Sequence, residues 1–366
     1  MRFDKKNKII DRIFGFPPPK FLRMPAVGVT ISDHSIKVME LLHSGNHLEI
    51  GRYGDIPIQE DVMIAGDIKD RKKLKDILLS IKEKFGIDFI YASVPEEKAY
   101  LFKIELPRES INNIRENIEF QLEEFVPISS KEAVFDYEII TERNNNDKIE
   151  VNVSAISEKY INDYLSIFQE AGMMPVSFEI EAQALKRAVV PAGDLGTYMI
   201  IDIGRTRTGI SIVSEGFLRY TSTVSIGGDS LITAIQKQTG VSFEEADKIK
   251  QKFGFIKNEK NAELYKSLTI TMSALEEEIN KRYSYWSESP ENINKNKRKI
   301  EKIILCGGNA HIPGFKEYLS LRIKTPVEIA NIWTNALSFD NYIPEISFNY
   351  SSGYASVVGL VLDEMY

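Results

Sequence analysis

A short polar turn between two apolar segments carries the residues best suited to hold a phosphate group. Residues 198–201 are apolar and residues 210–213 are mostly β-branched, which predicts two strands joined as a hairpin. The turn places Asp202 at the end of the first strand, and Gly204, which lacks a Cβ, lets backbone N–H groups approach an anion closely. The other side chains of the turn are donors: Arg205, Thr206, Arg207 and Thr208. The pattern predicts a phosphate cradle with Asp202 placed for a metal ion, and an ordinary surface hairpin is the alternative.

A second strand, turn and strand lie about 170 residues earlier in the chain. Residues 26–31 and 36–42 form the apolar flanks. Between and just after them stand Ser32, Asp33, His34, Ser35 and Lys37. His34 is interpreted as a turn residue, because it lacks the cluster of Cys, His or Glu that would make it a metal ligand. The likeness of the two cradles predicts duplicated halves that face a common ligand.

Three later features add groups that suit a nucleotide. A glycine pair precedes a predicted helix, where backbone N–H groups and the helix dipole favour an anion. An acid and a lysine stand three residues apart on the next helix, which is also the spacing of an ordinary solvated ion pair. A second glycine pair follows a buried strand at residues 303–306. These residues are Gly227, Gly228, Asp247, Lys250, Gly307 and Gly308.

Alternating strand and helix patterns supply the elements that must position these groups. Apolar residues recur at three and four positions within residues 74–85 and 111–125, which predicts two helices with one buried face each. Residues 134–140 and 149–155 flank Asn144, Asn145 and Asn146, a pattern typical of a hairpin. Residues 96–178 are therefore expected to form a small inserted α+β module.

Composition limits the class of protein. The formal charge is −7, and residues 1–25 contain seven Lys or Arg against two Asp, so the remaining chain carries −12. Such a balance argues against nucleic-acid binding by the main body. The single cysteine, Cys306, cannot form an intrachain disulfide, which fits a reducing cytosol. No run of 18 apolar residues is present, so no membrane span is expected. The basic leader, residues 1–24, is interpreted as a solvated segment or a peripheral contact with anionic membranes.

As a set, these stretches resemble the actin and Hsp70-like ATPase superfamily. The resemblance is closer to the type IV pilus assembly PilM family, which is related to the cell-division protein FtsA. It is carried in order by VGVTISDHSIKVMEL, IEFQLEEFVPISSKEAVFDYEI, EAGMMPVSFEIEAQALKRA, IGGDSLITAI and CGGNAHIPGFKEYLSLRIKTPVEIANIW. Together they span nearly all of residues 26–366.

The resemblance implies a two-lobed, ribonuclease H-like α/β fold with an inserted FtsA-type subdomain and ATP, with Mg²⁺, between the lobes. It assigns residues 32–35 and Lys37 to the first phosphate loop, and Asp202, Gly204, Thr206 and Thr208 to the second. It places Gly227 and Gly228 near the phosphates, Asp247 and Lys250 at the ribose, and Gly307 and Gly308 at the adenosine. The implied parts are a leader (1–24), lobe I (25–95 with 342–366), the inserted module (96–178), the lobe II core (179–228 with 300–341) and a lobe II helical subdomain (229–299).

Two departures from the family pattern bear on catalysis. Where relatives have Gly-Ile-Asp-Ile-Gly, this chain has Thr30 in place of the acid and Ser32 in place of the glycine. A lost carboxylate weakens the organisation of Mg²⁺, which prefers oxygen ligands. Arg205 stands where many relatives have a small residue, so it either contacts phosphate or fills part of the cleft. Asp202 is then the sole acid matched to the metal and the only candidate catalytic residue.

The resemblance implies a cytoplasmic scaffold at the inner face of the plasma membrane. Its implied partner is the short cytoplasmic N-terminal tail of the membrane protein PilN, within the inner-membrane pilus assembly complex. The partner tail is expected to dock between the inserted module and the first lobe, in a groove bordered by the helix at residues 111–125. The alternatives are an active ATPase, a small-molecule kinase of the same superfamily, and an FtsA-like filament former that self-associates.

Overall fold

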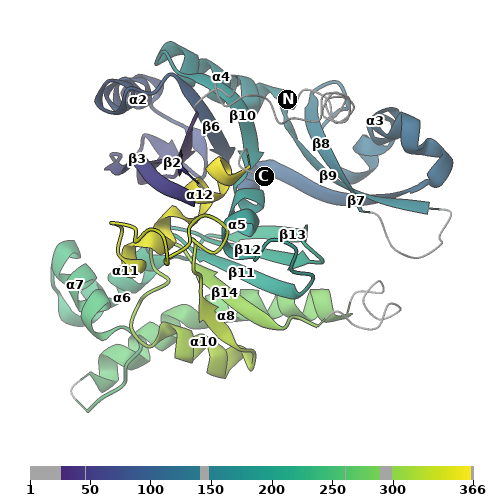
Figure 1. The fold of residues 1–366 in the computed structure, drawn as a ribbon. Coiled ribbons are helices and arrows are strands. Elements are labelled where there is room, and N and C mark those ends of the chain that lie inside the picture. The colour runs from purple at the N-terminus through teal and green to yellow at the C-terminus, as the bar shows by residue number, and fades with distance from the viewer. Residues whose placement is uncertain (1–25, 46, 141–147, 260, 289–298, 364–366) are drawn as a thin grey trace.

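Two sheet-containing lobes face each other, and a smaller module projects from one side (Figure 1). The computed structural model describes residues 26–45, 47–140, 148–259, 261–288 and 299–363. The predicted leader, the hairpin tip at Asn144, Asn145 and Asn146, and residues 289–298 lie outside the described residues. No helix in the described ranges combines the length and apolarity needed to cross a membrane.

The sheet of the first lobe has the order β10-β6-β1-β2-β3. Strand β1 pairs antiparallel with β2 and parallel with β6, which in turn pairs parallel with β10. The predicted turn at residues 32–35 therefore joins the two central antiparallel strands. The strands are β1 (Val27–Ile31), β2 (Ser35–Ser44), β3 (His47–Pro57), β6 (Phe89–Val94) and β10 (Met174–Ile180).

The sheet of the second lobe repeats this arrangement strand for strand. Its order is β13-β12-β11-β14-β15, with β11 antiparallel to β12 and parallel to β14. The strands are β11 (Thr197–Ile203), β12 (Thr208–Ser214), β13 (Phe217–Val224), β14 (Lys302–Cys306) and β15 (Val327–Ile329). The predicted duplicated halves and the two strand-turn-strand cradles are thus both present in the structure.

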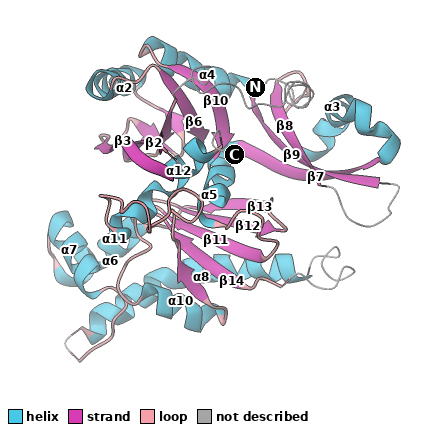
Figure 2. Cartoon of the chain, in the orientation of Figure 1, coloured by secondary structure: helices cyan, strands magenta, loops and turns pink. Residues whose placement is uncertain are grey.

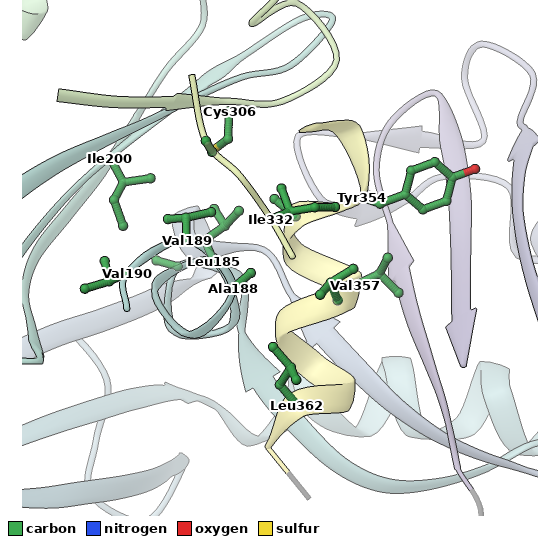
Figure 3. Packing of buried hydrophobic residues seen from close by; sticks show 14 of the residues in the cluster. Leu185, Ala188, Val189, Val190, Ile200, Cys306, Ile332, Tyr354, Val357 and Leu362 are labelled. Carbon is green, nitrogen blue, oxygen red and sulfur yellow. The ribbon is translucent and has the colours of Figure 1, made fainter. Parts of the chain in front are cut away.

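Two helices lie between the sheets and join the lobes into one core. Figure 2 shows α5 (Glu181–Val189) and α12 (Ala355–Leu362) between the magenta sheets. Figure 3 shows Leu185 of α5 on the side of Ile200 of β11, whereas Val357 of α12 packs near Gly28 of β1 in the first lobe. Every residue of α12 is buried, which fits a helix whose residues are all apolar except Ser356.

Other helices cover the outer faces of the sheets. On the first lobe, α2 (Arg71–Phe85) and α4 (Glu158–Glu170) bury apolar stripes against the sheet, with the small pair β4 (Met63–Ile64) and β5 (Asp67–Ile68) nearby. The second lobe carries α6 (Gly228–Thr239), α7 (Phe243–Phe253), α8 (Ala262–Glu288) and α10 (Phe315–Ile323). The short elements α11 (Phe348–Ser351) and η4 (Ser352–Tyr354) lead into α12.

The inserted module is smaller than the sequence suggested. It follows η2 (Glu96–Lys98) and consists of β7 (Ala99–Pro107), η3 (Arg108–Asn113), α3 (Ile114–Phe125), β8 (Ala133–Ile140) and β9 (Lys148–Ser157). Its sheet, β7-β9-β8, and α3 enclose a separate apolar core. By contrast, α4 packs on α2, and β10 pairs with β6 in the first lobe. The boundary placed at residue 178 therefore lies near residue 157, because the apolar stripe of α4 serves the first lobe.

Candidate functional site

The turn at residues 32–35 is called the first turn here, and the turn at residues 204–207 the second turn. Hydrogen bonds of Ser32 close the first turn. Ser32 Oγ accepts the backbone N–H of Ser35 at 3.1 Å and of His34 at 3.4 Å, and it donates to the Ser35 carbonyl at 2.9 Å. Lys37 Nζ donates to Ser35 Oγ at 3.0 Å and lies 3.6 Å from an Asp55 carboxylate oxygen. The N–H groups of His34 and Ser35 are therefore satisfied inside the turn, and Lys37 is the cation beside it.

Asp33, assigned to the first phosphate loop, makes contacts that leave its carboxylate fully engaged. It accepts the backbone N–H groups of Ala65 at 3.2 Å and Gly66 at 3.3 Å. Arg207 Nη2 of the second turn lies 3.0 Å from Asp33 Oδ1, and the same guanidinium also pairs with Glu97. The turns of the two lobes are thus joined directly by an ion pair.

The second turn is closed by a hydrogen bond from the Gly204 N–H to the Arg207 carbonyl at 2.9 Å. Thr206 lies half-buried within it. Thr208 is fully buried, and its hydroxyl donates to the Ile226 carbonyl at 2.6 Å. The expectation that Thr208 contacts phosphate is therefore wrong in this structure, because the first residue of β12 turns its hydroxyl into the protein.

The first glycine pair permits a close approach between α6 and the second turn. A Cβ on Gly227 would lie 2.5 Å from the Arg205 carbonyl oxygen, so only glycine fits there. Asp229, in the first turn of α6, pairs with Arg205 through both carboxylate oxygens at 3.0 Å. The Arg205 guanidinium also lies over the Phe243 ring. Arg205 therefore bonds to an acid of the protein itself at the end of α6 that favours negative charge.

Asn309, which the sequence analysis did not single out, links three of the predicted sites. Its Oδ1 accepts from Lys250 Nζ at 3.0 Å, and its Nδ2 donates to the Gly204 carbonyl at 2.9 Å. A Cβ on Gly228 would lie 2.4 Å from Asn309 Oδ1. Lys250 is buried and also pairs with Asp247 at 2.7 Å. Lys250 is therefore linked to the second turn through Asn309, and contact of Asp247 and Lys250 with a ribose stays a prediction.

Asp202 and the second glycine pair meet where two parallel strands end. Asp202 is paired in register with Cys306, and Gly307 has a φ of 90° that favours glycine. A Cβ on Gly307 would lie 2.2 Å from Asp202 Oδ1. Gly308 opens onto a cavity of about 510 Å³ whose other lining residues include Lys37, Tyr53, Asp55, Tyr350, Gly353 and Tyr354. The structure thus brings Lys37 of the first turn and Gly308 to one cavity.

Three carboxyl groups gather at the centre of the molecule. Burial raises the pKa of Glu96 to about 7, of Glu181 to about 8 and of Asp202 to about 6. The Asp202 charge raises the pKa of the other two further, whereas Lys37 opposes the shift of Asp202 and Glu181. Glu181 and Glu96 were missed from sequence. Glu181 begins α5, where an acid is ordinary because it complements the helix dipole.

These raised pKa values make folding stability depend on pH. Each group binds its proton more tightly when folded, so its stabilising contribution is present at low pH and is lost as pH rises through the folded pKa. We expect the melting temperature to fall between pH 5 and pH 8. Glu181→Gln should remove part of this fall and stabilise the protein at pH 8 by on the order of 1–3 kcal/mol. Thermal unfolding of the parent and the Glu181→Gln variant from pH 5 to pH 8 measures this effect. The prediction is contradicted if the melting temperature falls with pH by the same amount in both proteins.

The groups around the cleft fit a polyphosphate. Both ring nitrogens of His34 are buried and lack a hydrogen-bond partner among the described residues. Burial, followed by the Arg205 charge, lowers the pKa of His34, so the ring stays neutral and one nitrogen can donate to an anion. The described residues contain no group of three His, Cys, Asp or Glu side chains able to hold a metal. A magnesium ion would therefore rely on nucleotide oxygens and water besides Asp202.

The comparison with known families decides the identity. Residues 28–365 match the family described as "Type IV pilus assembly protein PilM". The chain belongs to the PilM family. The resemblance inferred from the sequence is confirmed, and so is the actin-like fold.

Solved structures share this fold at low sequence identity. A PilM-PilN type IV pilus biogenesis complex superposes with a TM-score of 0.76 at 17% identity, covering 94% of this chain and 99% of that chain. Ethanolamine utilization protein EutJ from Carboxydothermus hydrogenoformans superposes with a TM-score of 0.53 at 15% identity, covering 95% of this chain and 90% of that chain. MreB5 of Spiroplasma citri bound to ADP superposes with a TM-score of 0.58 at 13% identity, covering 93% of this chain and 97% of that chain.

Proposed function

We propose that this PilM-family chain is a nucleotide-binding scaffold of the type IV pilus machinery with little or no ATP hydrolysis. Membership of the family carries the scaffold role, and the MreB5 structure bound to ADP supports nucleotide binding in a fold of this kind. Weak hydrolysis rests on Thr30, which stands buried at the end of β1 where an acid is expected. Binding acts on the ground state, whereas hydrolysis needs further groups that act on the transition state.

ATP is proposed to lie between the two turns. Lys37, His34 and Gly204 would meet the phosphates, with Asp202 beside the metal ion. Lys250 and Asp247 would approach the ribose, and the glycines of residues 307–308 would border the adenosine. A bound nucleotide would supply the negative charge that the Lys37 side of the cavity attracts, and no chemical step is required of the chain for scaffolding.

The partner is proposed to be the cytoplasmic tail of a PilN-type membrane protein, because one structural neighbour is a PilM-PilN complex. The outer face of α3 offers an exposed aromatic side chain, Phe120, which is 87% exposed. Phe125, at the end of the same helix, is 44% exposed and stacks on Phe102 with ring centroids 4.9 Å apart. Exposed aromatic groups of this kind often anchor a peptide at an interface.

A tail-binding measurement tests this docking site. Phe120→Ala and Phe125→Ala together should weaken binding of a synthetic PilN-type tail peptide about tenfold or more, because anchor residues carry most of the binding energy. Leu321→Ala on α10 is the matched control, since Leu321 is 79% exposed but belongs to the second lobe. Unchanged affinity in the double variant, measured by calorimetry, would rule out α3 as the docking element.

The cellular location follows as part of the same proposal. The chain would act in the cytoplasm at the inner face of the membrane that holds its partner. Peripheral lipid contact through residues 1–24, and self-association, stay predictions, since the leader lies outside the described residues.

A further inference from the structure

The two-residue segment Glu96–Glu97 begins the connection from the first lobe to the inserted module and is held by the second lobe. Glu96 is only 7% exposed. Its carboxylate accepts from the hydroxyls of Thr221 and Thr223 on β13, each at 2.8 Å. Glu97 pairs with Arg207 of the second turn. Both acids therefore cross from the start of the module to the opposite lobe.

Residues of two neighbouring strands, β12 and β13, form the site that binds the Glu96 carboxylate. Thr221 and Thr223 are two residues apart on β13, so their side chains share one face of the strand. On the neighbouring strand, a Cβ at Gly209 would lie 2.7 Å from Glu96 Oε1. Glycine at this position leaves the space that the carboxylate occupies. Two hydroxyl donors and one glycine thus form a socket for a buried acid.

Arg207 ties this segment to the first turn. The guanidinium is 20% exposed and contacts both Glu97 and Asp33, whose side chains are 22% and 11% exposed. A phosphate between the two turns would present oxygen acceptors that suit the planar guanidinium equally well. An anion in the cleft would therefore compete with Glu97 and Asp33 for Arg207.

A second set of contacts fastens the module further along β13. Arg219 pairs with Glu150 of β9 at 2.5 Å, and Asn152 Nδ2 donates to the Leu218 carbonyl at 3.0 Å. These contacts do not involve the turns. The module would remain attached to β13 through them, and through Glu96, if Arg207 moved away from Glu97.

We propose that Glu96, Glu97 and Arg207 are positioning residues that fix the orientation of the inserted module, and that an anion bound between the turns releases the Glu97 part of this hold by drawing Arg207 away. The module then reorients about the contacts that remain, which are those of Glu96, Asn152 and the Arg219–Glu150 pair. The release rests on the proposed nucleotide site, whereas the hold itself does not. The cleft would in this way control how the partner-binding module is presented.

Distances between spin labels on the intact chain test the hold. Labels at Glu124→Cys on α3 and Leu321→Cys on α10 report the orientation of the module, and buried Cys306 stays unlabelled. Without nucleotide, we expect one narrow distance distribution for the parent and a broadened or shifted one for Arg207→Gln. Glu96→Ala should behave similarly, and Glu96→Gln should restore the parent distribution because the amide oxygen still accepts from a threonine. Arg322→Gln, which breaks an ion pair with Glu276 inside the second lobe, is the control.

The outcomes separate the two parts of the proposal. A parent distribution retained in both Arg207→Gln and Glu96→Ala would overturn the hold. Addition of Mg-ADP to the parent should reproduce the change seen in Arg207→Gln, and calorimetric binding of ADP without any change would overturn the release. Absence of ADP binding would overturn the release together with the nucleotide proposal, while the variants still decide the hold.

Discussion

The Gly359→Ala variant is expected to lose about 3 kcal/mol or more of folding free energy, the upper range for overpacking a core. Gly359 lies in α12 where this helix crosses α5 between the two sheets. An added Cβ would lie 1.8 Å from the Ala184 carbonyl oxygen and 2.4 Å from its carbon. Both neighbours are backbone atoms of a buried helix, so the strain must be relieved by separating α5 from α12. Denaturant unfolding measures the loss.

Gly308→Ala is the matched control for this effect. An added Cβ at Gly308 would meet no atom within 4 Å, and the backbone of Gly308 does not adopt a positive φ. Its stability should stay within about 0.5 kcal/mol of the parent, as for surface substitutions in general. Equal stability of the Gly359→Ala and Gly308→Ala variants would show that the crossing of α5 and α12 is not tightly packed.

Thr30→Asp is expected to raise ATP turnover by a factor of ~10² or more. A positioned acid or base typically contributes a factor of ~10² to 10⁴ to a reaction rate. Thr30 is buried at the end of β1 and paired in register with Lys37 of β2. A carboxylate there would face a lysine across the strands, which offsets the cost of burying its charge. It would supply the second acid for a magnesium ion opposite Asp202.

Thr30→Asn controls for this change, because asparagine matches the shape of aspartate without its charge. It should leave phosphate release at the parent level. If the Thr30→Asp and Thr30→Asn variants release phosphate equally slowly, a missing carboxylate is not the cause of weak hydrolysis.

Asp202→Ala should lower Mg²⁺-dependent ATP binding, since Asp202 is the acid proposed beside the metal.

The sheets and cradles were predictable because each is specified locally. An apolar strand, a polar turn with Gly204 or Ser32 and a second apolar strand encode a hairpin whatever lies elsewhere in the chain. Repetition of this pattern then indicated two similar lobes. The apolar stripe of α4, by contrast, does not say which sheet the helix covers. The extent of the inserted module was therefore overestimated.

The interactions within the cleft could not be predicted because they join distant parts of the chain. Glu96 and its partner Thr221 are separated by 125 residues, and Lys250 and Asn309 by 59. An isolated acid or asparagine in a sequence reads as a surface residue, and only the fold shows that each is buried against its partner. The two arginines of the second turn looked like phosphate ligands for the same reason, since Asp33 and Asp229 reach them only in the folded chain.

Phosphate release by the unaltered protein, measured with Mg-ATP in the presence and absence of a PilN-type tail peptide, tests the central claim most directly. A nucleotide-binding scaffold predicts release at the background rate in both conditions, while calorimetry on the same sample shows that ATP and the peptide are bound. Sustained turnover, or turnover stimulated by the peptide, would contradict the scaffold and establish an active ATPase.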